Sequence, residues 1–182
     1  MRKQIDKKLL HAFLTRLDES LDRPGVVFLL GGSSLVWRDI KKYSMDIDLA
    51  LAGDEPDPIA LLDAIDRAQD FIETTVDIIR MGETMPLPDD FGSRAEKVED
   101  LNLRFLTVRH FDPYSIALTK LNRSEQRDFS DVGAMVGSGL IDCAELRHHA
   151  ESVATRFPRG TSRPDKDDFR RKVDGFLRQF CE

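Results

Sequence analysis

The sequence predicts an α/β protein in which a mixed β-sheet is flanked by helices and followed by a helical C-terminal segment. Up to residue 111, helical stripes of apolar residues alternate with short apolar or alternating runs typical of strands. After Asp112-Pro113, helical stripes follow one another to the end of the chain. We therefore expect residues 1–111 to form an α/β core and residues 112–182 to form a helical segment packed on it.

The predicted elements follow from local pattern. An apolar stripe predicts a helix over residues 4–22, ended by Arg23-Pro24-Gly25. The elements that follow are a buried strand at 26–30, a short helix at 35–40, strands at 45–52 and 74–79 separated by a helix at 59–71, a loop at 80–92, and short strands near 97–101 and 103–109. The later helices are expected to break at 137–139 and 158–164.

Composition excludes several classes of protein. With 41% hydrophobic and 33% charged residues over 182 positions, the chain can bury a core, so disorder is not expected as its main state. The net charge of −6 argues against a coat that binds nucleic acid regardless of sequence. The apolar runs are too short to span a bilayer, and we expect no membrane partner. The charged N-terminus lacks the apolar stretch of a secretion signal, which predicts a cytoplasmic location.

The chain has two cysteines, Cys143 and Cys181. Two cysteines cannot build a disulfide framework, and this pair lacks the spacing of metal ligands. We therefore interpret both as reduced thiols, as in a cytosolic protein.

A turn of glycine and serine follows the first predicted strand. Gly31 and Gly32 allow a ligand to approach the backbone closely and expose N–H groups to an anion. Ser33 and Ser34 add hydroxyl donors, and a helix starting here would direct its positive end to the same place. The turn has the outline of a phosphate-binding loop, although a tight strand-to-helix connection explains it equally well.

Paired carboxylates follow on the next predicted strand. Asp46 and Asp48 are two residues apart, so on a strand both leave the same face, roughly 6.6 Å apart. Such a pair can hold one Mg²⁺ or bridge two ions. The alternative is a solvated edge strand, which the apolar residues between and after the acids disfavour. Asp77, in the middle of the strand at 74–79, is a candidate third carboxylate or a surface residue.

Two blocks of sequence resemble the nucleotidyltransferase superfamily with the DNA polymerase β-like fold. The first joins the Gly31–Ser34 turn to the run from Lys42 to Leu49, which contains Asp-Ile-Asp. The second runs from Asp112 to Leu121 and continues with Arg127-Asp128-Phe129-Ser130-Asp131, resembling a helix-borne lysine and its downstream acidic segment. The resemblance covers roughly residues 26–142. Small prokaryotic members, including nucleotidyltransferase-type toxins of toxin–antitoxin and abortive-infection systems, are especially similar.

The resemblance implies a role for each matched residue. Gly31, Gly32, Ser33 and Ser34 would bind the nucleotide, together with Lys42, which replaces the family's arginine, and Lys120. Asp46, Asp48 and Asp77 would be the catalytic and metal-binding residues, with two Mg²⁺ ions as cofactor and Asp77 activating the acceptor hydroxyl. The reaction would move a nucleotidyl group from an NTP to RNA or tRNA, a protein or a small molecule. Asp128 and Asp131 share a helix face and either position Lys120 or form a solvated acidic surface.

Two other functions stay open at this point. A catalytically silent member of the fold would act as a binding or regulatory module with a protein partner, much as an antitoxin does. A metal-dependent phosphohydrolase also fits paired aspartates but explains the glycine turn less well. The basic residues near the C-terminus indicate either a surface for RNA or a partner, or a solvated amphipathic helix; they are Arg156, Arg159, Arg163, Arg170, Arg171 and Lys172.

Overall fold

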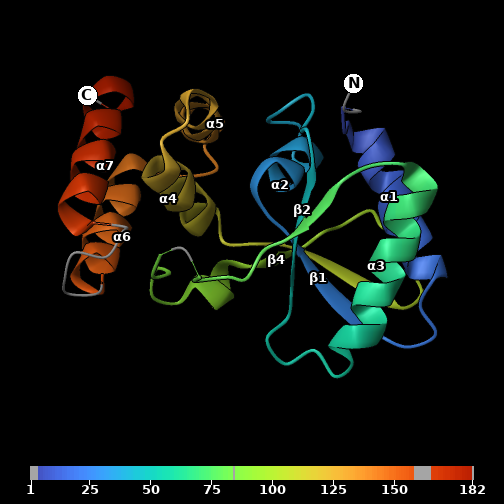
Figure 1. Cartoon of the computed structure of the whole chain (residues 1–182). Helices are drawn as coiled ribbons and strands as arrows, with labels where there is room; N and C mark the ends of the chain where they lie inside the picture. The colour runs from blue at the N-terminus through green and yellow to red at the C-terminus, as the bar shows by residue number, and fades with distance from the viewer. Residues whose placement is uncertain (1–3, 84, 158–164, 182) are drawn as a thin grey trace. The chain divides into compact units, whose positions relative to one another are not determined.

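A computed structural model describes residues 4–83, 85–157 and 165–181 and confirms the mixed α/β class (Figure 1). The chain divides into two compact units. The first comprises Met1–Arg80 and Glu96–Phe111, and the second Met81–Ala95 and Asp112–Glu182. The segment 81–95, which precedes the last strands in sequence, thus groups with the C-terminal helices. Among the described residues, no helix has the length and apolar character needed to cross a bilayer.

The first unit is built on a five-stranded mixed sheet with the order β3-β2-β1-β5-β4. The strand β1 pairs antiparallel with β2 and parallel with β5. The strands β2 and β3 are parallel, and β4 and β5 are antiparallel. The bounds are Gly25–Leu29 for β1, Ile47–Leu51 for β2, Val76–Ile78 for β3, Glu96–Lys97 for β4 and Leu106–His110 for β5.

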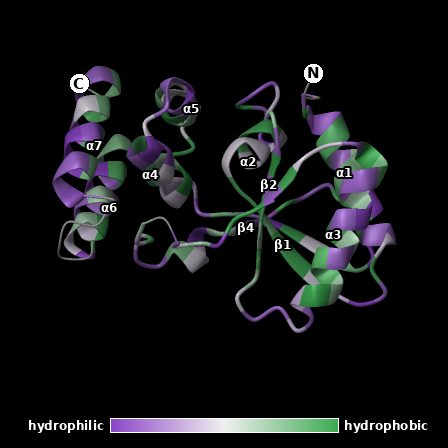
Figure 2. Cartoon of the chain, viewed as in Figure 1, coloured by the Kyte–Doolittle hydropathy of each residue, from purple (hydrophilic) through white to green (hydrophobic). Residues whose placement is uncertain are grey.

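Two helices, α1 (Lys7–Glu19) and α3 (Pro58–Ile72), lie side by side and pack on this sheet (Figure 1). Apolar residues recur along each at helical spacing, so each helix has one apolar stripe (Figure 2). The stripe of α1 is buried at Leu10, Phe13, Leu14 and Leu17. The apolar core therefore lies between these helices and the alternate strand residues, including Val27, Leu29, Ile47, Leu49, Leu106 and Val108.

Two predicted elements of this unit differ in the structure. The helix α2 covers Gly31–Trp37, so it begins at the first glycine of the turn and not at residue 35. The strand expected over 97–101 is only the two residues of β4. Farther along, the Asp18 carboxylate accepts the backbone N–H groups of Arg104, Phe105 and Leu106 at 2.7–2.9 Å. A side chain of α1 thus binds the backbone at this point of the chain, and β5 begins at Leu106, not at residue 103 as expected.

The second unit contains a 3₁₀ turn, Phe91–Arg94, and four helices: α4 (Pro113–Arg123), α5 (Gln126–Gly137), α6 (Cys143–Thr155) and α7 (Lys166–Phe180). Asp112 caps α4, and Asp142 caps α6, by accepting backbone N–H groups of the first turn. The helix α5 ends at Gly137, as the predicted break at 137–139 requires, and Gly139 has a φ of +73°. The break predicted at 158–164 lies outside the described residues.

The interpretation of the cysteines as reduced thiols is wrong, because a disulfide joins Cys143 to Cys181. Cys143 is the first residue of α6 and Cys181 caps the end of α7. These helices pack against each other in opposite directions, which brings the two Cα atoms to 6.0 Å across 38 residues of sequence. The argument for a cytosolic location from free thiols therefore no longer holds, and that location stays a prediction.

Candidate active site

Asp48 is held against the glycine turn through both its backbone and its side chain. The N–H of Gly32 donates to Oδ2 of Asp48 at 3.0 Å, and the N–H of Asp48 donates to Oγ of Ser33 at 2.9 Å. The carbonyl of Asp48 accepts the N–H of Leu30 at 3.0 Å. The turn between β1 and α2 therefore fixes the orientation of this carboxylate.

Close contact explains why both positions of the turn are glycine. Gly31 has a φ of +43°, and a Cβ on it would lie 2.5 Å from Oδ2 of Asp48. A Cβ on Gly32 would overlap with Oγ of Ser44 and lie 2.9 Å from the Cβ of Ser44. The side chains of Ser44 and Asp48 occupy the space that side chains of the turn would need.

Replacing Gly32 by alanine is expected to lower the free energy of unfolding by about 1–3 kcal/mol, since the added methyl group overpacks this contact. Ser44→Gly removes the opposing atoms, so the double variant should be more stable than the sum of the single changes predicts. Urea unfolding measures all three variants. Gly53→Ala is the matched control, because nothing lies within 4 Å of a Cβ there. Strict additivity of the two changes would contradict the contact.

The other two predicted carboxylates are Asp46, which precedes Asp48 on the same segment, and Asp77, which lies on the neighbouring strand. Asp46 lies at a bend immediately before β2, half-buried, so it precedes the strand on which it was expected. Asp77 is exposed on β3 and is the register partner of Asp48 across the parallel β2–β3 pair. Register partners point to the same face of a sheet, so Asp48 and Asp77 share a face.

The described residues contain no group of three His, Cys, Asp or Glu side chains close enough together to hold a metal ion. Mg²⁺ does not require such a group, because it keeps several waters and commonly binds one or two carboxylates together with substrate phosphates. Asp48, with Asp46 two residues away and Asp77 in register, supplies the hard oxygen ligands that suit this ion. The chemistry of the side chains therefore fits Mg²⁺ bound together with a nucleotide.

The two serines of the turn point into the protein. Ser33 is fully buried, with Oγ on the N–H of Asp48, and Oγ of Ser34 lies 2.9 Å from Nδ1 of His110. His110 is 6% exposed, at the end of β5. Burial, aided by the positive charge of Arg38, lowers the pKa of His110 from 6.5 to about 4. The imidazole is therefore neutral near pH 7.

This buried histidine makes stability depend on pH. In the unfolded chain His110 takes up a proton near pH 6.5, whereas the folded protein resists it until about pH 4. Stability from this group is complete above pH 6.5 and should fall by about 3 kcal/mol as the pH drops to 4. Urea unfolding followed by Trp37 fluorescence, which reports on the same unit, tests this. His110→Gln should flatten the dependence and the exposed His148→Gln should not; equal slopes would contradict the assignment.

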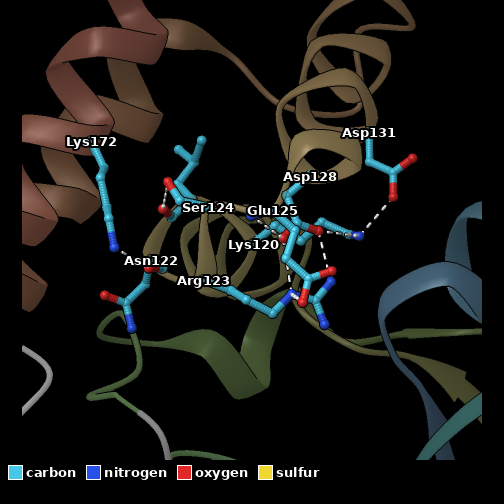
Figure 3. A network of polar contacts seen from close by, with 9 residues as sticks. Lys120, Asn122, Arg123, Ser124, Glu125, Asp128, Asp131 and Lys172 are labelled. Carbon is cyan, nitrogen blue, oxygen red and sulfur yellow. Dashed lines mark hydrogen bonds and ion pairs between the residues drawn. The ribbon is translucent and has the colours of Figure 1, made fainter.

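The two predicted lysines lie in different units. Lys42 is exposed on the loop before β2. Lys120, on α4 of the second unit, is 7% exposed, and Nζ donates to Asp131 at 2.7 Å and to Asp128 at 3.3 Å (Figure 3). Of the two interpretations of the downstream acids, the structure therefore supports the one in which Asp128 and Asp131 position Lys120.

Asp128 is the centre of this buried network. Arg123 donates two hydrogen bonds to it, at 2.9 and 2.7 Å (Figure 3). Burial acts to raise the pKa of Asp128, but the hydrogen bonds from Arg123 and the charge of Lys120 outweigh it, so the pKa lies below its usual value. The carboxylate is therefore ionised and ties the end of α4 to the start of α5.

The basic residues near the C-terminus are largely engaged by acids of the same unit. Arg156 pairs with Asp89 at 3.0 Å, and Arg170 pairs with Glu151 at 2.9 Å. Asp168 accepts from both Arg171 and Lys172. These pairs favour a solvated helix surface over a polyanion-binding one. Arg159 and Arg163 lie outside the described residues.

Comparison with known protein families gives a match over most of the chain. Residues 7–179 match the model of a family described as "Nucleotidyltransferase of unknown function (DUF6036)". The chain belongs to this family. No match was found among curated proteins or among solved structures. The suspected relationship to nucleotidyltransferases is thus confirmed at the level of the family.

The matched region of this nucleotidyltransferase family member spans both units and includes every candidate residue from Gly31 to Lys120. Two residues of the site region were not singled out from sequence. Ser44 could have been found because it continues, two residues earlier, the spacing of Asp46 and Asp48. His110 carried no local signal, since it looks like the polar end of an ordinary alternating strand.

Proposed function

We propose that this family member is a Mg²⁺-dependent nucleotidyltransferase that transfers a nucleotidyl group from an NTP to a hydroxyl acceptor. The observation that carries the proposal is the attachment of Asp48 to the Gly31–Gly32 turn, with Asp77 on the same face of the sheet. This combination brings a glycine turn, which a phosphate chain can approach closely, next to carboxylates that suit a divalent cation.

Each residue of the site would have its own role in such a reaction. Asp46 and Asp48 would hold Mg²⁺ together with the phosphates of the nucleotide, and the bound ion would neutralise the phosphates and lower the pKa of the acceptor hydroxyl. Gly31 and Gly32 would border the triphosphate, and the hydrogen bond from Gly32 keeps Asp48 oriented. The exposed Asp77 carboxylate would accept the proton of the acceptor hydroxyl.

The bonds formed and broken follow from this arrangement. The acceptor oxygen bonds to the α-phosphorus, the bond from that phosphorus to the bridging oxygen breaks, and pyrophosphate leaves. Positioning and charge neutralisation are the main requirements of phosphoryl-type transfer. The acceptor would be RNA or tRNA, a protein side chain or a small molecule, and the family resemblance suggests a role in a toxin–antitoxin or defence system in the cytoplasm.

Transfer of label from each α-³²P-labelled NTP in the presence of Mg²⁺ tests the proposal, with total tRNA, cell extract and protein as acceptors. Label that appears in one acceptor with wild-type protein, and not with the double variant Asp46→Asn and Asp48→Asn, is the expected result. No transfer, together with no Mg²⁺-dependent NTP binding by calorimetry, would contradict it.

One observation favours a second function, a binding or regulatory module without catalysis. The described part of the chain has no three-residue metal cluster, so ion binding would depend on the nucleotide. A module of this kind would bind a protein partner equally well after Asp48→Asn, whereas a transferase would lose its activity.

A further inference from the structure

The negative charge of this chain is concentrated in one segment of the first unit. Residues 54–77 contain eight acidic residues and one basic residue, Arg67, which is a net charge of −7. The rest of the chain, with 26 basic and 25 acidic residues, carries +1. The same segment and the two residues after it hold five of the seven exposed large hydrophobic side chains in the described part of the chain: Ile59, Leu62, Phe71, Ile78 and Ile79. Acidic and exposed apolar side chains therefore occur together around α3 and β3.

The strand β3 is at one edge of the sheet, and part of its backbone faces outward. The carbonyl of Thr75 accepts a hydrogen bond from β2 at 2.9 Å, and the N–H of Ile79 donates one to β2 at 2.8 Å. Because alternate residues of a strand bond to the same neighbour, the N–H and C=O groups of Val76 and Ile78 point away from β2. Outward groups of this kind are what an added strand binds.

One side of α3 lies along this edge. Oε1 of Gln69 accepts the outward N–H of Val76 at 3.0 Å, so the side of the helix that carries Gln69 faces β3. Leu62 and Asp66 precede Gln69 by seven and three residues, and helical spacing places them on the same side. Both are exposed. The next outward N–H along the edge is that of Ile78, which is 40% exposed.

The two faces of the sheet present different side chains next to this edge. Ile78 is the register partner of Leu49, which is buried in the core under the helices, so Ile78 is on the helix face, as is Leu62. Asp77 is on the opposite face, since successive residues of a strand alternate. A strand added to β3 would therefore have alternate side chains against apolar groups and against a carboxylate. An extended segment with alternating apolar and basic residues fits both faces.

We propose that the outer edge of β3 binds an extended segment of a partner protein in which basic and apolar residues alternate. The backbone of the segment bonds to Ile78, its apolar side chains pack on Ile78 and Leu62, and its basic side chains lie beside Asp77 and are attracted by Asp66. A second copy of this chain fits less well, because pairing β3 with β3 would bring two segments of charge −7 together. The inference goes beyond the proposed function and does not rest on it.

A fluorescent peptide of alternating lysine and valine, of about eight residues, is the probe. Two comparison peptides have glutamate in place of lysine, or all lysines before all valines, which keeps the composition and removes the alternation. Fluorescence anisotropy with the full chain at low ionic strength gives the affinities. We expect the alternating lysine peptide to bind at least about tenfold more tightly than either comparison peptide. Exchange of the Ile78 amide hydrogen, followed by nuclear magnetic resonance, should slow when this peptide is bound.

Two pairs of variants locate the binding. Ile78→Pro removes the outward N–H without removing a bond to β2, because an edge strand tolerates proline at such a position, and should weaken binding about tenfold. Ile78→Val keeps the N–H and should bind like wild type. Asp66→Lys should weaken binding about fivefold. Glu99→Lys, its control, makes the same change of charge at an exposed acid that follows β4, at the opposite edge of the sheet, and should have little effect.

Several results would overturn the inference. Equal binding by Ile78→Pro and Ile78→Val is one, and unchanged exchange of the Ile78 amide is another. Equal affinity for the alternating and the block peptide would show charge attraction alone. Self-association of wild type that Ile78→Pro abolishes, seen by sedimentation equilibrium, would make a second copy the occupant. If Ile78→Pro does not fold, Asp66→Lys against Glu99→Lys decides. Because these measurements use no nucleotide, their failure leaves the proposed function untouched.

Discussion

Under the proposed function, replacing Asp48 by asparagine is expected to reduce nucleotidyl transfer about a thousandfold, because it removes one of the carboxylates proposed to bind the metal, and with it several kcal/mol of charge stabilisation. The fold should be retained. Asparagine keeps an oxygen that can accept the N–H of Gly32, and the backbone contacts of residue 48 with Leu30 and Ser33 do not involve the carboxylate. The melting temperature should therefore differ little from that of wild type.

Initial rates of label transfer with the acceptor found for wild type measure this effect, over a range of Mg²⁺ concentrations. Asp63→Asn is the control, since Asp63 is an exposed aspartate on α3 of the same unit. It loses the same charge and should transfer at the wild-type rate. An Asp48→Asn protein that transfers as fast as Asp63→Asn would show that the carboxylate has no role in the reaction.

In the first unit, the elements that depend on local sequence pattern could be predicted, and those that depend on contacts between residues far apart in sequence could not. The pattern of apolar residues alone predicts α1, α3 and the strands around Val27 and Leu49. Each of these elements has either one buried face or two, and burial of this kind leaves a regular apolar pattern in the sequence. The start of β5 was not predictable, since it depends on hydrogen bonds from residues 104–106 to Asp18, far away in sequence. Local pattern carries no information about such a contact.

The same limit applies to the candidate site and to the cysteines. The sequence indicates that Asp48 and the Gly31–Gly32 turn belong together only through the family resemblance; their contact depends on the pairing of β1 with β2. The direction of each serine hydroxyl is likewise a tertiary property. Cys143 and Cys181 meet because α6 and α7 pack in opposite directions, which spacing along the chain does not reveal.

The second large effect is expected for Lys120→Met, which should destabilise the helical unit by about 3–5 kcal/mol. The ammonium group is buried, 2.7 Å from Oδ2 of Asp131 and 3.3 Å from Oδ1 of Asp128. Removing it leaves the buried carboxylates of Asp128 and Asp131 without the positive charge of Lys120. Far-ultraviolet circular dichroism in urea follows all helices, and Trp37 fluorescence shows whether the first unit is affected.

Lys166→Met is the control, because Lys166 is exposed at the start of α7 and its loss should change stability by less than about 0.5 kcal/mol. A Lys120→Met protein as stable as this control would contradict a structural role for the buried ammonium.

The double variant Lys120→Met with Asp131→Asn separates the role of charge from that of packing. The main loss of stability in Lys120→Met is expected to come from a buried carboxylate that has lost its ammonium partner. Neutralising Asp131 should then recover part of the lost free energy of unfolding, so the two changes should be non-additive by about 0.5–3 kcal/mol. If the loss came from packing of the lysine stem, the double variant would be at least as unstable as the sum. Because Nζ of Lys120 lies closer to Oδ2 of Asp131, at 2.7 Å, than to Oδ1 of Asp128, at 3.3 Å, Asp131 is the acid at which this charge effect should be greatest.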